Sequence, residues 1–77
     1  MKDKVLSILA KIRPEFDFSK DINFFEKGMI DSFDLVIFVS ELDAEFGISI
    51  DGLDMLPENF SSLDKIVELI KKNGAKE

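Results

Sequence analysis

The chain has 77 residues, a net charge of −6, and neither cysteine nor histidine. This length suits one small domain, and a hydrophobic content of 45%, including eight phenylalanines, is enough for a compact core. The missing residue types exclude disulfides, thiol catalysis and the usual zinc sites. The negative charge disfavours nucleic acid, which needs a clustered positive field, and suits a basic protein partner.

Membrane insertion and secretion are not indicated either. The longest apolar run, Leu35–Val39, is far too short to span a bilayer. The N-terminal stretch Met1–Lys4 lacks the apolar segment of a secretory signal. We therefore expect a soluble cytoplasmic protein.

The first predicted element is a helix over about residues 2–13. Its apolar residues follow helical spacing: Val5, Leu6, Ile8, Leu9 and Ile12. Lys11 and Arg13 suit the negative end of the helix dipole, and Pro14 ends the element.

A long irregular segment, residues 14–31, follows this helix. Its core-forming side chains are Phe16, Phe18, Ile22, Phe24 and Phe25. Because it is so apolar, we expect a loop that packs across the helices. Ser19 or Asp21 is a candidate cap for a short turn, and Gly28 suits a positive φ.

The second predicted helix covers about residues 32–46. Its core face is predicted to consist of Leu35, Val36, Val39, Leu42 and Phe46, with Phe38 at the edge. Asp31 is the expected N-cap, and Asp34 follows three residues later in the first turn. Gly47 is well placed to end the helix.

The region after residue 47 is harder to interpret. Ile48 and Ile50 alternate with polar residues as in a strand, but no second strand pattern exists to pair with them. We therefore predict a short helix over about residues 52–56, capped by Asp51 and ended by Pro57.

The last predicted helix covers about residues 62–73, with Ser61 as its N-cap and Asp64 at N3. Its apolar face consists of Leu63, Ile66, Val67 and Ile70. The fold class is therefore all-α: one domain over residues 1–77, with three main helices, one short helix and a long first loop, in up-down topology.

The pair Asp31-Ser32 lies where the loop ends and the second helix begins. A helix N-terminus presents unpaired N–H groups and a partial positive charge, so a serine there can hold a phosphodiester. The adjacent carboxylate could bind Mg²⁺ or orient the hydroxyl while a separate enzyme transfers a phosphate-containing group. On the dipeptide alone, an ordinary helix cap is the simpler interpretation. Catalysis by Ser32 is excluded because no histidine base and no Gly-x-Ser-x-Gly turn is present.

The surrounding sequence resembles the acyl carrier protein family. The resemblance lies in Phe24–Val36, in Ser40–Ile48 and in Asn59–Leu63, and it covers essentially the whole chain with four helices in matching order. It implies that a phosphopantetheinyl transferase moves 4′-phosphopantetheine from coenzyme A onto Ser32, with Asp31 assisting. It also implies a protein without catalysis of its own, which carries acyl or aminoacyl thioesters from a loading ligase to an acyltransferase or synthase.

The motif differs from that of fatty-acid carriers, which usually read Leu-Gly-x-Asp-Ser-Leu. Here the stretch is Gly-Met-Ile-Asp-Ser-Phe, and this Gly-x-x-Asp-Ser form is similar to that of D-alanyl carrier proteins and other freestanding carriers. A D-alanyl carrier used in teichoic acid modification is therefore one alternative. An unmodified acidic helical interaction module, in which Ser32 only starts a helix, is another.

The candidate partner-binding residues are Phe33, Asp34, Ile37, Ser40, Glu41 and Met55. Phe33, Ile37 and Ser40 lie on one side of the second predicted helix, where exposed apolar side chains would form a docking surface. The alternative is that Phe33 and Ile37 are core residues. Asp34 and Glu41 belong to an acidic line that either steers basic enzymes or is simply solvated. We expect a monomer that binds neither metal nor nucleic acid.

Overall fold

The computed structural model describes residues 1–20 and 22–75. It contains the helices α1 (Lys2–Ile12), α2 (Ser32–Phe46) and α3 (Leu63–Lys72), and two short 3-10 helices, η1 (Gly52–Asp54) and η2 (Pro57–Phe60). No strand occurs among the described residues, so the predicted all-α class is confirmed. None of these helices is long and apolar enough to cross a membrane.

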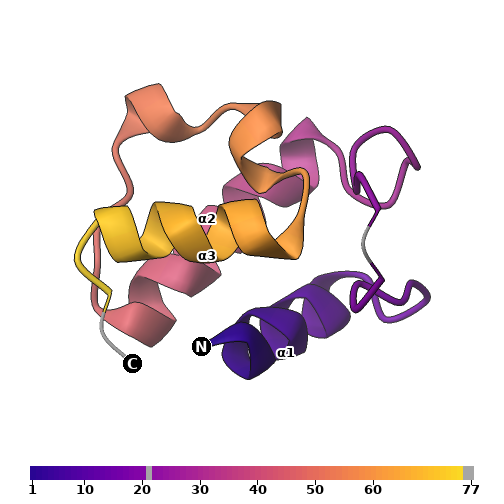
Figure 1. Ribbon diagram of the computed structural model, residues 1–77, viewed down its shortest axis with the longest axis horizontal. Coiled ribbons are helices and arrows are strands. Elements are labelled where there is room, and N and C mark those ends of the chain that lie inside the picture. Colours follow the sequence, from indigo (N-terminus) through magenta and orange to yellow (C-terminus); the bar gives the residue numbers. More distant parts are fainter. Residues whose placement is uncertain (21, 76–77) are drawn as a thin grey trace.

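The three α-helices pack around one core, and η2 contacts both α2 and α3. In Figure 1, α3 lies in front of α2, α1 lies below them, and the two 3-10 helices run along the top edge. Where a short helix was expected over residues 52–56, the structure has the 3-10 turn η1, and a second 3-10 turn, η2, follows it. Asp51 caps the first turn, but Pro57 begins the second one instead of ending the element, because proline fits a first helical position.

The core is rich in phenylalanine. Its fully buried side chains are Phe24, Phe38, Phe60, Leu9, Leu42, Ile66, Ile70 and Val5. The prediction for one face of α2 was wrong in detail: Val36 is 58% exposed, whereas Phe38 is 1% exposed and packs edge-on against Phe60 with ring centroids 6.1 Å apart. The rotation of α2 thus turns Phe38, and not Val36, toward the core.

The loop between α1 and α2 contributes to the core, as its apolar sequence predicts. Phe18 and Phe24 are buried and pack edge-on, with ring centroids 5.0 Å apart. The Phe24 N–H donates to the carbonyl of Ser61 at 2.8 Å, which ties the loop to the segment before α3. The loop therefore arrives at the start of α2 along a fixed path.

Two predicted caps need correction. Ser19 does not cap its turn: its N–H and its hydroxyl both donate to the carboxylate of Asp17. The alternative cap, Asp21, lies outside the described residues. Ser61 is buried and donates to the Glu58 carbonyl, so the N-cap of α3 is Ser62, whose hydroxyl accepts from the Lys65 N–H at 3.3 Å. The 3-10 helix η2 uses Ser61 to close its own turn, and this moves the start of α3 by one residue.

Candidate functional site

Ser32 is the first residue of α2, and it is exposed. The turn before it is fixed, because Gly28 has φ of 68° and the Met29 N–H donates to the Phe24 carbonyl at 2.9 Å. Met29 and Ile30 are both buried, so the chain is anchored up to two residues before Ser32. The fold thus presents one hydroxyl to solvent from a rigid support.

Asp31 is the N-cap of α2, as predicted. Its Oδ1 accepts from the Asp34 N–H at 2.9 Å, and Asp34 Oδ2 accepts from the Asp31 N–H at 3.4 Å, which completes a capping box. Because Asp31 satisfies the orphan N–H of the first turn, the hydroxyl of Ser32 is not needed for capping.

A second support for this helix start comes from the far end of α1. Arg13 Nε donates to Asp34 Oδ2 at 2.8 Å, and its terminal nitrogens lie 3.8 Å from Asp31 Oδ2 and 3.6 Å from Glu15 Oε2. The hydrogen bond and charge of Asp34 raise the pKa of Arg13, with smaller contributions from Glu15 and Asp31. The sequence pattern predicts only that Arg13 is a cation near a helix end. It does not predict the contact with Asp34, because the two residues are 21 positions apart.

The carboxylate of Asp34 is therefore turned toward the helix start and not toward solvent. Asp34 is 6% exposed, and its carboxylate is engaged by Arg13 and by the Asp31 N–H. The expectation that Asp34 belongs to an exposed acidic line was wrong. Its polar atoms are turned inward to the helix start.

The exposed face of α2 is apolar close to Ser32. Phe33 is 76% exposed, Val36 58% and Ile37 41%, and we call these three residues the α2 apolar surface. Ser40 is exposed as well, one turn further along. Val36 was missed as a surface residue because its spacing also fits the core face.

The remaining candidate residues occupy less open positions. Glu41 is half-buried, and its Oε2 pairs with Lys11 Nζ at 3.1 Å. Met55 is half-buried between the two 3-10 helices, whereas the neighbouring Leu53 and Leu56 are 84% and 45% exposed. Leu53 and Leu56 were assigned to a short helix but not to a surface, since their exposure depends on how that segment folds.

Comparison with known proteins identifies the family. The model of the phosphopantetheine attachment site family matches residues 3–70. The chain belongs to this family. It is a carrier protein, whose cofactor is a 4′-phosphopantetheine covalently attached to a serine.

Curated relatives agree with this assignment. The chain is 27% identical to the D-alanyl carrier protein of Lactococcus lactis subsp. cremoris (strain MG1363) over 74 residues, 94% of each chain. It is 26% identical to the D-alanyl carrier protein of Lactococcus lactis subsp. lactis (strain IL1403), again over 94% of each chain. The match thus extends over nearly the whole carrier protein, as the sequence resemblance implied.

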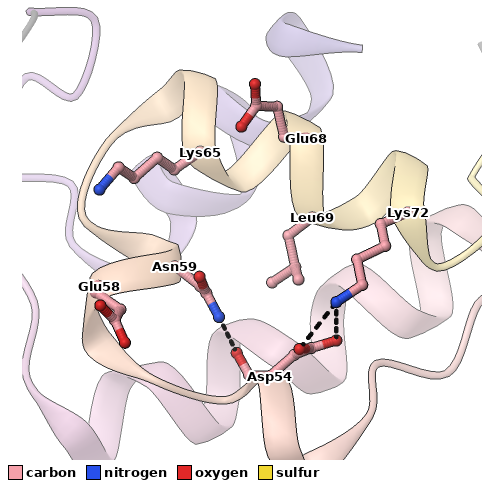
Figure 2. A pocket seen from close by; sticks show the side chains of 7 residues that line it. All are labelled: Asp54, Glu58, Asn59, Lys65, Glu68, Leu69 and Lys72. Atoms are coloured by element: carbon pink, nitrogen blue, oxygen red, sulfur yellow. Dashed lines mark hydrogen bonds and ion pairs between the residues drawn. The ribbon is translucent and has the colours of Figure 1, made fainter.

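A polar depression lies between the 3-10 helices and α3, and its lining residues join these elements (Figure 2). Lys72 Nζ contacts both carboxylate oxygens of Asp54 at 3.2 and 3.3 Å, and Asn59 Nδ2 donates to the Asp54 carbonyl at 2.9 Å. None of the predicted site residues lines this depression. Its polar groups hold η1 against α3 and so fix the segment that contains Met55.

Carrier proteins are generally non-catalytic, because their cofactor supplies the reactive thiol. What the site near Ser32 provides is an open hydroxyl, the positive end of α2, and a carboxylate at Asp31 that is 64% exposed. Ligases and transferases are the general partners of such a protein.

Proposed function

We propose that Ser32 is the serine that receives 4′-phosphopantetheine. The observation that carries this proposal is the exposed Ser32 hydroxyl at the N-terminus of α2, directly after the capping carboxylate of Asp31. The dipole of this helix partly offsets the negative charge of a phosphodiester. The residues present therefore suit a phosphate-linked group.

The other serines suit the modification less well. Ser61 is buried, and its hydroxyl donates to a backbone carbonyl. The hydroxyl of Ser62 caps α3, and that of Ser19 donates to Asp17. Ser7 and Ser40 lie within α1 and α2, where the following N–H groups are already bonded along the helix, and Ser49 lies outside any helix, after the end of α2. Ser32 combines an exposed hydroxyl with the positive end of a long helix.

Asp31 is the residue that assists attachment in this proposal. Its Oδ1 is held by the Asp34 N–H, which leaves Oδ2 directed toward Arg13 and solvent. An exposed carboxylate beside the accepting hydroxyl can share a Mg²⁺ ion with the incoming phosphate, or orient the hydroxyl for attack. The transferase supplies the rest of the site.

The loaded carrier protein then delivers acyl or aminoacyl thioesters to a downstream acyltransferase or synthase. The α2 apolar surface, with Ser40, Glu41 and Met55 around it, is the proposed docking site for these enzymes. Exposed apolar side chains next to the tethered cargo are suited to transient protein contacts. The proposal includes a cytoplasmic location and a monomeric state, in keeping with a carrier that visits several enzymes in turn.

A D-alanyl cargo is the second candidate. It is favoured by the similarity to two D-alanyl carrier proteins over 94% of the chain and by the Gly28-x-x-Asp31-Ser32 spacing. In that case the loading enzyme is an adenylating ligase, and the cargo serves teichoic acid modification. Incubation of the holo protein with such a ligase, ATP and D-alanine distinguishes it from a fatty acyl carrier by the mass of the thioester that forms.

One experiment tests the attachment site. Wild type and Ser32→Ala are incubated with coenzyme A, Mg²⁺ and a promiscuous phosphopantetheinyl transferase, and intact masses are measured. The wild type gains one phosphopantetheine and Ser32→Ala gains none. An unchanged wild-type mass would instead support the acidic interaction module, and a modified Ser32→Ala would move the site to another serine.

A further inference from the structure

Arg13 lies outside the attachment motif, yet it is bound to both acidic residues that frame Ser32. Its Nε donates to Asp34 Oδ2 at 2.8 Å, and its terminal nitrogen lies 3.8 Å from Asp31 Oδ2. Its backbone is itself fixed, because the Arg13 N–H donates to the Leu9 carbonyl at 2.9 Å at the end of α1. The guanidinium thus reaches from one helix end to the start of the next.

From this geometry we infer that Arg13 is a positioning residue for the modification of Ser32. It acts through Asp34, which holds Asp31 in place, and so it keeps the hydroxyl and its neighbouring carboxylate in the arrangement that the transferase engages. This inference rests on the proposed attachment at Ser32 and adds a residue that the motif does not contain.

The physical argument begins with the burial of Asp34. A carboxylate that is 6% exposed needs a charged partner, since an unpaired buried charge is costly. Arg13 is the ion-pair partner that the structure gives to Asp34. Without the guanidinium, the Asp34 side chain gains by turning toward water.

That rotation would disturb Asp31 directly. Asp34 Oδ2 accepts from Arg13 Nε and also from the Asp31 N–H at 3.4 Å, so the same oxygen connects α1 to the capping box. If Asp34 turns away, the Asp31 N–H loses its acceptor and the backbone before Ser32 loosens. Group transfer is sensitive to such displacements, because a shift of about 1 Å at the reacting groups can cost as much as a hundredfold in rate.

Arg13 also balances charge at this point. Three carboxylates, those of Glu15, Asp31 and Asp34, surround its guanidinium within 3.8 Å. An incoming phosphate would meet these negative charges beside Ser32. The guanidinium offsets these charges, and the Asp31 side chain beside it is still 64% exposed, so that it can orient the phosphate or its metal ion.

The test is the kinetics of phosphopantetheine transfer to the apo protein, with Arg13→Gln, Asp34→Asn and the double variant, at a temperature where circular dichroism shows all of them folded. Arg13→Gln is expected to lower kcat by about tenfold, with the KM for the apo protein little changed because the α2 apolar surface is intact. Asp34→Asn should also lower kcat, because a neutral amide oxygen holds Arg13 less strongly than the carboxylate does. The double variant should be no slower than either single one, since both act through one contact.

The matched control is Lys2→Gln, which removes another ion pair of α1, the 3.0 Å contact to Asp64 on α3. It should transfer at the wild-type rate. Wild-type kinetics in Arg13→Gln, a loss expressed only in KM, or multiplicative losses in the double variant would each overturn the inference.

Failure of the proposed function would look different, since wild type itself would then gain no phosphopantetheine.

Amide hydrogen exchange tests the network independently of modification. In Arg13→Gln the Asp31 and Asp34 N–H groups should exchange faster, whereas the same amides in Lys2→Gln should not. Unchanged exchange in Arg13→Gln would also overturn the positioning role.

Discussion

Asp31 is the N-cap of α2 and, in our proposal, the carboxylate that assists attachment at Ser32. Two substitutions separate these two roles. Asp31→Ala removes both the capping oxygen and the charge, whereas Asp31→Asn keeps an equally good capping oxygen and removes only the charge. The capping bond at stake is the 2.9 Å contact from the Asp34 N–H to Asp31 Oδ1. Losing such a cap costs about 1 kcal/mol, and the charge at a helix N-terminus contributes about 0.3–1 kcal/mol more.

These magnitudes translate into melting temperatures. For a chain of this size, 1 kcal/mol corresponds to about 4–8 °C in Tm. Asp31→Ala should therefore melt about 4–8 °C below Asp31→Asn, and the lost charge should place Asp31→Asn about 1–8 °C below wild type. Both variants lack the carboxylate, so both should accept phosphopantetheine at least about tenfold more slowly than wild type.

Far-UV circular dichroism gives the Tm values, and a time course of intact masses gives the transfer rates. Wild-type transfer in Asp31→Asn would refute a role for the carboxylate in attachment and leave Asp31 as a cap only. Equal melting of the two variants would refute the argument that the capping bond holds the start of α2. Because the two readouts are predicted to separate, general damage to the fold cannot produce the expected pattern.

Three further predictions concern packing, docking and pH. Phe38→Ala should cost about 3–5 kcal/mol, a large part of the stability of a small domain, whereas the same change at the 76% exposed Phe33 should shift Tm only slightly, as thermal melts will show. Ile37→Glu should weaken loading by the partner ligase while the fold is kept, with Ile37→Val as the matched control; unchanged loading kinetics would exclude Ile37 from the docking site. Hydrogen bonds from Ser19 lower the pKa of Asp17 below its usual 3.8. These hydrogen bonds therefore stabilise the folded protein at pH values above 3.8, and this stabilisation is lost as the pH falls through the lowered pKa. An NMR titration should find the Asp17 midpoint below 3.8 in wild type and closer to it in Ser19→Ala.

Local features of this chain were predictable because their causes are local. Asp31 caps α2, and Gly47 ends it with φ of 64°, as short-range patterns indicate. The assignment of Phe38 and Val36 to the core edge and the core failed, because α2 is apolar on several sides and spacing alone does not fix its rotation. The rotation of α2 is set by its packing against distant segments of the chain.

The candidate site shows the same division. The Asp31-Ser32 motif was recognisable in the sequence, but the burial of Asp34 was not, since it depends on a partner at the end of another helix. The choice between Ser61 and Ser62 as a cap also depended on the preceding 3-10 turn. Pairings across the fold carry information that no window of neighbouring residues contains.

The two helix starts of this protein explain how a serine at such a position stays available. In α3 the serine is the N-cap itself, and the hydroxyl of Ser62 is occupied by the Lys65 N–H. In α2 the capping position is taken by Asp31, so Ser32 stands one residue later, inside the first turn and exposed. A capping serine gives its oxygen to the helix, whereas a serine that follows a capping aspartate keeps its hydroxyl in the same positive field. Asp31 thus has two functions: it caps α2, so that the Ser32 hydroxyl is not used for capping, and in our proposal it assists the modification of that hydroxyl.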